Sequence, residues 1–186
     1  VGGFAVRPPS FLPIGAAGTT EAFTKEFGYR QDLDKSKAFL QQAGLPNGFE
    51  FDLSITNAAI VGTNYQVIAQ KVQSDLARVG IKANLKPLDP VNLRTQYNGG
   101  RTTSVITFWN PPSPETDLWA SASIERVAKR VGWDVPQPMR DLVKAAAAEQ
   151  DQARQIALYK QYQQQLVDNA HYLILLVGSL LMLGIL

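Results

Sequence analysis

The segment that decides the fold reads NGFEFDLSITNAAIVGTNYQVIAQKVQSDLARVGIKANLKPLDP and runs from Asn47 to Pro90. Apolar and polar residues alternate from 49 to 56 and again from 81 to 86, which is the period of a strand with one buried face. Between these stretches, apolar residues recur at helical spacing in a single stripe: Tyr65, Ile68, Ala69, Val72, Leu76 and Val79. A strand, a helix and a strand of these lengths predict a βαβ unit with parallel strands and a right-handed crossover. We therefore expect an α/β fold whose core is this unit.

Local start and stop signals define the elements in and before this segment. Thr63 or Asn64 can cap the central helix, and Gly80 ends it. Upstream, Asp32 predicts the cap of a helix that Gly44 ends. The expected inner face of that upstream helix is Leu33, Ser36, Phe39, Leu40 and Ala43. Residues 1–31 show no sustained period, which predicts a loop or linker.

The second half predicts one more strand and several helices. Residues 91–97 predict a short helix, and 104–110 (SVITFWN) predict a third strand of the same sheet. Ser113-Pro114-Glu115 predicts the start of a helix that continues to Val131, with an inner face of Ile124, Val127, Ala128 and Val131. Its cations Arg126, Lys129 and Arg130 predict a solvated face.

Two further helices close the pattern. The first carries Met139, Leu142, Val143 and Ala146, and the second runs from 152 to about 169 after the cap Asp151. The expected inner stripe of the second helix is Leu158, Tyr159, Tyr162, Leu166 and Ala170. Its glutamines are expected at the surface: Gln161, Gln163, Gln164 and Gln165.

Composition excludes several classes of protein. The chain of 186 residues suits one α/β domain with arms, and its formal net charge of +2 gives no support for a polyanionic partner or a nucleic acid. The absence of cysteine excludes disulfides, thiolate metal sites and thiol catalysis. No signal peptide is recognised, and the Pro/Gly-rich opening VGGFAVRPPS predicts a fragment or a processed product.

The sequence offers little for catalysis. His171 is the only histidine, it lies beside an apolar stretch, and it is expected to be a packed or edge residue. No histidines and acids have metal-ligand spacing, and the Gly-Gly pairs lack the lysine of a phosphate loop. We therefore expect neither an enzyme nor a cofactor or metal.

A binding site has better support. Ligands of open α/β sheets bind beyond the carboxyl ends of the strands, where Asn57 and the pair Trp109-Asn110 stand. Residues 172–186 (YLILLVGSLLMLGIL) carry no charge, but a helix of that length is shorter than the roughly 30 Å hydrocarbon core of a bilayer. We therefore do not interpret this stretch as a membrane span.

Order and spacing over most of the chain resemble a known family. DLDKSKAFLQQAGLPNGFEFDL, followed by YQVIAQKVQSDLARVGIKANLKPLD, resembles the C-terminal lobe of the family 5 extracytoplasmic solute-binding proteins, the peptide- and nickel-type receptors of ABC importers. The resemblance implies a three-layer lobe with a mostly parallel sheet, like the type II periplasmic binding proteins. It implies a linker or arm at 1–31, the lobe at 32–177, and an apolar segment at 178–186 that crosses back toward an N-terminal lobe absent from this sequence.

The same resemblance indicates ligand-binding residues. Trp109 and the Pro-rich turn after it resemble the family's Trp-x-x-Asp-x-Pro-Asp-Pro segment, which faces the cleft. Peptide-binding members place there an aspartate that pairs with the terminal ammonium of the ligand, and Pro112 stands at that position here. This departure argues against transferring free-peptide specificity. The candidate ligand-binding residues are Trp109, Asn110, Glu115, Asp117, Trp119 and Asn57. Trp109 and Trp119 have a second interpretation, in which they only pack the strand onto the helix.

The resemblance implies a function. The parent protein is expected to capture a small solute, peptide-like or otherwise polar or cationic, between two lobes in the periplasm and to present it to an ABC permease. Two alternatives stay open. One is a hydrolase or other enzyme on a related sheet, which would depend on His171. The other is a protein-docking module, favoured if Trp109 is buried and the apolar tail pairs with another chain.

Overall fold

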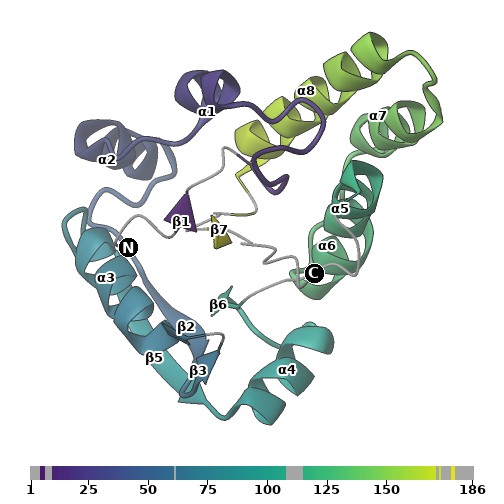
Figure 1. The fold of residues 1–186 in the computed structure, drawn as a ribbon. Coiled ribbons are helices and arrows are strands. Elements are labelled where there is room, and N and C mark those ends of the chain that lie inside the picture. The colour runs from purple at the N-terminus through teal and green to yellow at the C-terminus, as the bar shows by residue number, and fades with distance from the viewer. Residues whose placement is uncertain are drawn as a thin grey trace. The chain divides into compact units, whose positions relative to one another are not determined.

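The computed structural model describes residues 5–6, 10–60, 62–107, 115–170, 172 and 177–178. They belong to two compact units (Figure 1). The sheet unit comprises Arg30–Asn110 and Lys129–Gly132. The helical unit comprises Val1–Tyr29, Pro111–Ala128 and Trp133–Leu186. Among the described residues, no helix combines the length and the apolar character that crossing a membrane requires.

A three-stranded parallel sheet forms the centre of the sheet unit. Its strands are β2 (Glu50–Thr56), β5 (Lys82–Leu88) and β6 (Val105–Ile106), in the order β5-β2-β6. The register pairs Leu53 with Leu85 and Ser54 with Val105. The parallel βαβ unit and the third strand of its sheet are therefore confirmed. Of the predicted strand 104–110, residues 108–110 lie outside the described residues.

Helix α3 (Tyr65–Ala77) connects β2 to β5 and covers the sheet. The side chain of Asn64 caps it by accepting hydrogen bonds from the N–H groups of Gln66 and Val67, so Asn64 rather than Thr63 is the cap. The core between helix and sheet is Leu53, Ile55, Ala69 and Ala83, with Phe51, Val72, Leu76, Leu85 and Ile106 packed against it. A short antiparallel pair, β3 (Ala59–Ile60) and β4 (Thr63–Asn64), precedes the helix and was not predicted.

Strand β2 departs from the predicted one-sided burial. Ser54 and Thr56 are buried together with Leu53 and Ile55, whereas Phe49, just before the strand, is 42% exposed. The reason is that β2 is the central strand, with neighbours on both edges, and contacts both α3 and α4 (Pro90–Asn98). Alternating apolar and polar residues indicate a strand with one face buried and one face exposed. Only the first half of β2 has this arrangement.

Helix α2 (Leu33–Gln42) has the predicted cap but not the predicted inner face. The Asp32 carboxylate accepts from the Lys35 N–H at 2.9 Å. Of the predicted face only Leu40 is buried, and Phe39 is 57% exposed with the Lys35 ammonium 5.7 Å from its ring centre. Phe39 therefore does not belong to the core of the sheet unit.

Five helical stretches make up most of the second half of the chain. They are α5 (Thr116–Ala122), the π-helical turn η1 (Ser123–Val127), α6 (Ala128–Arg130), α7 (Gln137–Ala148) and α8 (Gln152–Asn169). Ile124, Val127 and Ala128 are buried as predicted, but Val131 is 39% exposed because the helix has already ended at Arg130. Helix α5 begins at Thr116 with extended Glu115 in the N-cap position, so the predicted start, with Ser113 as the cap and Glu115 inside the helix, is wrong; residues 113 and 114 themselves lie outside the described residues.

The first segment of the chain packs into the helical unit through a buried glutamine. Gln163 of α8 is fully buried, and its Oε1 accepts hydrogen bonds from Ser10 Oγ at 2.7 Å and Thr19 Oγ1 at 3.0 Å. The prediction that Gln163 is exposed is wrong. Gln163 lies on the buried stripe of α8 with Tyr159, Tyr162 and Leu166, at the spacing i, i+3, i+4, i+7. Its position on the helix therefore places it inside, although its side chain is polar.

Residues 1–31, predicted to be a loop or linker, contain elements that the absence of a period concealed. Helix α1 (Glu21–Phe27) begins after Thr20, whose hydroxyl accepts from the Phe23 N–H at 3.1 Å, and Leu12 is fully buried. Strands β1 (Ala5–Val6) and β7 (Val177–Gly178) pair antiparallel. The predicted boundaries 1–31, 32–177 and 178–186 stay predictions, and residues 179–186 lie outside the described residues.

Candidate functional site

The predicted ligand-binding residues fall into three groups. Glu115, Asp117 and Trp119 stand together at the start of α5 in the helical unit. Asn57 follows β2 in the sheet unit. Trp109 and Asn110 lie outside the described residues, so their interpretation stays a prediction.

The carboxyl edge of the parallel sheet presents exposed polar side chains. Asn57 is exposed, while its backbone N–H donates to Leu88 O at 2.9 Å and so joins the ends of β2 and β5. β6 is paired with β2, and exposed Thr107 follows it. Ligands of α/β sheets bind at the strand ends, and there Asn57 combines a backbone that is hydrogen-bonded to the end of β5 with an exposed side chain.

The start of α5 is anchored by contacts within the helical unit. Thr116 Oγ1 accepts from the Ala17 N–H at 2.9 Å, while Glu115 and Asp117 on either side are exposed. Trp119 is half-buried and meets Phe11 edge-on, with ring centres 6.0 Å apart. This ring contact joins Trp119 to the Phe11 segment within the helical unit.

The π-turn that follows α5 is held by side-chain hydrogen bonds. In a π-turn the backbone hydrogen bonds join residues five apart instead of four apart. Here side chains donate hydrogen bonds to two carbonyls of the turn. Tyr172 Oη donates to Ser123 O at 2.8 Å, and Arg140 Nη1 donates to Ile124 O at 3.5 Å. Ser123 Oγ donates to Ala120 O at 2.7 Å, which makes Tyr162 the donor in its hydrogen bond with Ser123 Oγ. Burial raises the pKa of Tyr162 and keeps that phenol protonated.

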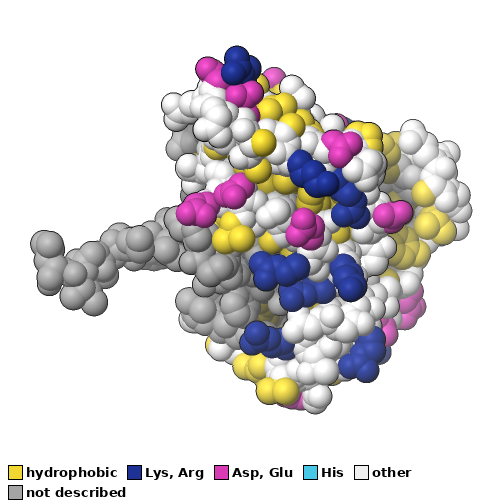
Figure 2. Space-filling model, turned by 90° about the vertical axis from the view of Figure 1, so that its right-hand side faces the viewer, with side chains coloured by type: hydrophobic (Ala, Val, Ile, Leu, Met, Phe, Trp, Pro, Cys, Tyr) yellow, Lys and Arg dark blue, Asp and Glu magenta, His cyan; other side chains and the backbone are white. Residues whose placement is uncertain are grey.

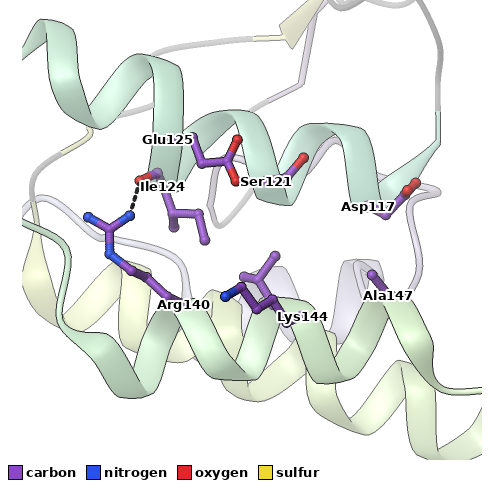
Figure 3. Close-up of a pocket in the computed structure, with 8 residues that line it drawn as sticks. Asp117, Ser121, Ile124, Glu125, Arg140, Lys144 and Ala147 are labelled. Atoms are coloured by element: carbon purple, nitrogen blue, oxygen red, sulfur yellow. Dashed lines mark hydrogen bonds between the residues drawn. The ribbon is translucent and has the colours of Figure 1, made fainter.

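A groove of about 250 Å³ separates α5 and η1 from α7 (Figure 3). Asp117, Ser121 and Glu125 line it from one side, and Arg140 and Lys144 from the other. Apolar residues complete the lining: Ile124, Val143 and Ala147. Arg140 is fixed there by its bond from Nε to Val135 O at 3.2 Å and by Asp134 at 3.9 Å.

The groove combines carboxylates on one wall with cations on the other, which suits groups of opposite charge on one small molecule. Sequence reasoning found Asp117 but missed Ser121, Arg140 and Lys144. Arg140 and Lys144 reach the groove from a helix that begins some twenty residues later in the chain, and only packing of α7 beside α5 brings them there. Within the described part of the chain, no group of three or more acids and histidines could hold a metal ion.

Asp117 also acts on a buried phenol. Burial and the nearby charge of Asp117 raise the pKa of Tyr159 from 10.0 to about 12. Because the pKa is higher in the folded state, the neutral phenol stabilises the fold fully below about pH 10, and this contribution is lost as the pH rises toward about 12. We expect the free energy of unfolding of Tyr159→Phe to fall less steeply between these pH values than that of the unchanged chain.

Urea unfolding at several alkaline pH values measures this difference. Tyr162 is present in both proteins, and because burial is the main cause of its raised pKa and the charge of Tyr159 a smaller one, most of its titration is common to the two profiles. Parallel pH profiles for the two proteins would contradict the expectation.

Comparison with known proteins supports the fold and the family. The chain is 29% identical over 153 residues to the dipeptide-binding protein of Escherichia coli strain K12, covering 79% of this chain and 28% of that protein. It is 25% identical over 198 residues to the glutathione-binding protein GsiB of the same strain, covering 95% of this chain and 38% of that protein. The chain thus spans less than two-fifths of the length of either relative.

A solved structure shows the same fold. It is the ABC transporter-associated periplasmic binding protein DppA from Helicobacter pylori in complex with the peptide STSA. The TM-score is 0.79 at 23% identity, and the match covers 95% of this chain and 34% of that one. The sequence model of the family described as "Bacterial extracellular solute-binding proteins, family 5 Middle" matches residues 1–124. By this match, and by the parallel α/β architecture that it accompanies, the chain belongs to the family 5 bacterial extracellular solute-binding proteins.

Proposed function

We propose that the chain forms one wall of a solute-capturing cleft in a receptor protein of an ABC importer. The observation that carries the proposal is the family match over residues 1–124, which includes the whole parallel sheet and the anchored Asn57 at its carboxyl edge. The relatives named for dipeptide and for glutathione bind compact molecules that carry charges. The proposed solute is likewise peptide-like, or another small polar or cationic compound.

The proposed roles follow from the chemistry of each side chain. Trp109 offers an apolar face to the solute, and Asn110, Glu115 and Asp117 offer polar or acidic partners to a cationic or hydroxylated group. Exposed Asn57 provides both a donor and an acceptor, and Trp119 borders the acids of α5. Pro112 stands where peptide-binding members have an aspartate, so the solute's cation would need one of the neighbouring acids.

The proposed mechanism is closure of two lobes around the solute, without a chemical step. A solute that contacts both walls stabilises the closed state over the open one. The partners are a second lobe of the same protein and a membrane permease, and the proposed location is the periplasm. Of the two alternatives, the enzyme depends on His171 and the docking module on Trp109 and the apolar tail. His171, Trp109 and most of the tail (173–176 and 179–186) lie outside the described residues.

Trp109→Ala tests the proposed cleft. We expect it to weaken solute binding by the two-lobe parent by ~2 kcal/mol or more, as for an aromatic hot spot. Its stability should change far less than the roughly 3–5 kcal/mol that truncation of a buried aromatic costs. Native mass spectrometry of the parent identifies the co-purified solute, and calorimetry with that solute measures the affinity.

Trp133→Ala is the matched control. Trp133 is only 7% exposed and packs edge-on against Tyr172, with ring centres 5.5 Å apart. Its truncation should cost roughly 3–5 kcal/mol of stability and leave the affinity of the folded protein unchanged. A Trp109→Ala protein that loses stability but keeps its affinity would assign Trp109 to the core and contradict the proposed site.

A further inference from the structure

Four cationic side chains of the sheet unit form one surface, which we call the basic surface: Arg94, Arg101, Lys129 and Arg130. Arg94 lies on α4, Arg101 follows that helix, and Lys129 and Arg130 end α6. All are exposed except Arg130, which is half-buried. Figure 2 shows one face of the molecule, on which several Lys and Arg side chains gather with Asp and Glu side chains among them. The sequence places the two pairs about thirty residues apart, so their juxtaposition comes from the fold.

Close contacts hold the two parts of the basic surface together. The Arg130 guanidinium lies over the ring of buried Tyr97, 5.1 Å from its centre. A Cβ added at Gly100 would lie only 3.6 Å from Arg130 O and 3.8 Å from Lys129 O, so the two backbones approach closely. A Cβ added at Gly99 would lie 3.3 Å from Arg101 Nε. The turn after α4 and the end of α6 are therefore packed against each other, which brings the segments that carry the four cations together.

Within the described residues, none of the four cations forms an ion pair with an acid. Three acids stand nearest along the chain. Asp89 caps α4 by accepting from the N–H groups of Val91 and Asn92, Asp134 pairs with Arg140, and Glu125 forms no ion pair in the described part of the chain. Clustered like charges repel, so an anionic partner would relieve this repulsion.

Apolar side chains at the edge of the basic surface indicate which partner fits. Val91 is 74% exposed and lies three residues before Arg94, on the same side of α4. Val131 is 39% exposed and directly follows Arg130. Cations beside exposed apolar side chains suit the boundary between lipid headgroups and acyl chains. We propose that the basic surface binds the anionic headgroups of a phospholipid bilayer, with Val91 and Val131 at the headgroup boundary.

Vesicle co-sedimentation of the full 186-residue chain tests this proposal. The probes are phosphatidylcholine vesicles with about one-third phosphatidylglycerol, and pure phosphatidylcholine vesicles. The chain should bind the anionic vesicles, and this binding should weaken as salt is added because the attraction is screened. The triple variant Arg94→Gln/Arg101→Gln/Lys129→Gln should lower the partition coefficient at least about tenfold. Arg130 is left in place because it packs on Tyr97.

A charge-matched variant, Lys35→Gln/Lys37→Gln/Lys144→Gln, controls for net charge, because either triple changes the formal net charge from +2 to −1. Its binding to anionic vesicles should decrease at most two- to threefold. Equal losses in the two triples would overturn the proposal, since they would show a response to overall charge. Salt-insensitive binding that neither triple changes would overturn it too, because it would arise from apolar residues elsewhere. Polyglutamate and soluble phosphatidylglycerol headgroups are then compared as competitors that displace the chain from the vesicles. If polyglutamate displaces the chain at the lower concentration, the proposal is overturned in favour of an acidic protein partner.

Discussion

Gly48→Ala is expected to lower the free energy of unfolding by ~3 kcal/mol or more. Gly48 has φ +80°, a left-handed conformation that costs a residue with a Cβ roughly 1–2 kcal/mol. A Cβ there would also lie 2.0 Å from Gly80 O and 2.3 Å from Gly80 C. These are backbone atoms at the turn before β5, so no side-chain rotation can relieve the clash, and overpacking of this kind adds typically 1–3 kcal/mol.

The clash would disrupt the first rung of the βαβ unit. Lys82 N–H donates to Phe49 O at 2.8 Å directly beyond the two glycines, which starts the parallel ladder between β2 and β5. Gly80 itself has φ +85°, and a Cβ there would lie 2.8 Å from Asn47 O. The two turns thus approach each other with backbone against backbone, and only glycine at both positions permits this.

Gly44→Ala is the matched control for this experiment. Gly44 has φ +75°, but no atom lies within 4 Å of its Cβ position, so the substitution should cost only the roughly 1–2 kcal/mol of the left-handed conformation. Urea unfolding of the two variants beside the unchanged chain measures both losses. Equal losses at the two positions would show that the turns separate easily and that the close approach does not determine the fold.

The second large effect concerns binding by the 186-residue chain alone, which is expected to be about 4 kcal/mol weaker than binding by the two-lobe parent that we propose. Tight small-molecule sites bury roughly 70–90% of their ligand, and one lobe offers one wall. If the parent binds at micromolar strength, about −8 kcal/mol, and the walls contribute comparably, the chain alone retains about −4 kcal/mol, near millimolar.

Calorimetry of the two proteins with the solute identified from the parent measures this difference. Analytical ultracentrifugation of the chain in the same buffer establishes that the binding species is a monomer. Micromolar or tighter binding by the monomeric chain would show that the site is complete within these residues. The two-lobe capture mechanism would then have to be abandoned.

Local sequence determined the elements whose signals are short in range. Asp32, Asn64, Asp89 and Asp151 cap helices because a side chain reaches a backbone N–H two or three residues away, whatever surrounds it. The alternation around Leu53 and Ala83 with the stripe of α3 between them predicted the parallel βαβ unit, because neither pattern can bury its apolar face alone. Candidate site residues on strand and helix ends were found in the same way, and their role stays a prediction.

Tertiary structure alone decided the features that depend on what packs from elsewhere in the chain. Gln163 lies on the inner stripe of α8, but the fold supplies what its side chain meets there: its Oε1 accepts from the hydroxyls of Ser10 and Thr19, more than 140 residues away, whereas its buried Nε2 has no partner among the described residues. Ser54 and Thr56 are buried because β2 is the central strand and contacts α4 as well as α3. Phe39 is exposed although its spacing places it on the inner stripe of α2. The groove beside Asp117 and the basic surface both join residues from separate helices. Periodicity states which face of an element is apolar, but only the neighbours that the fold supplies decide what that face meets.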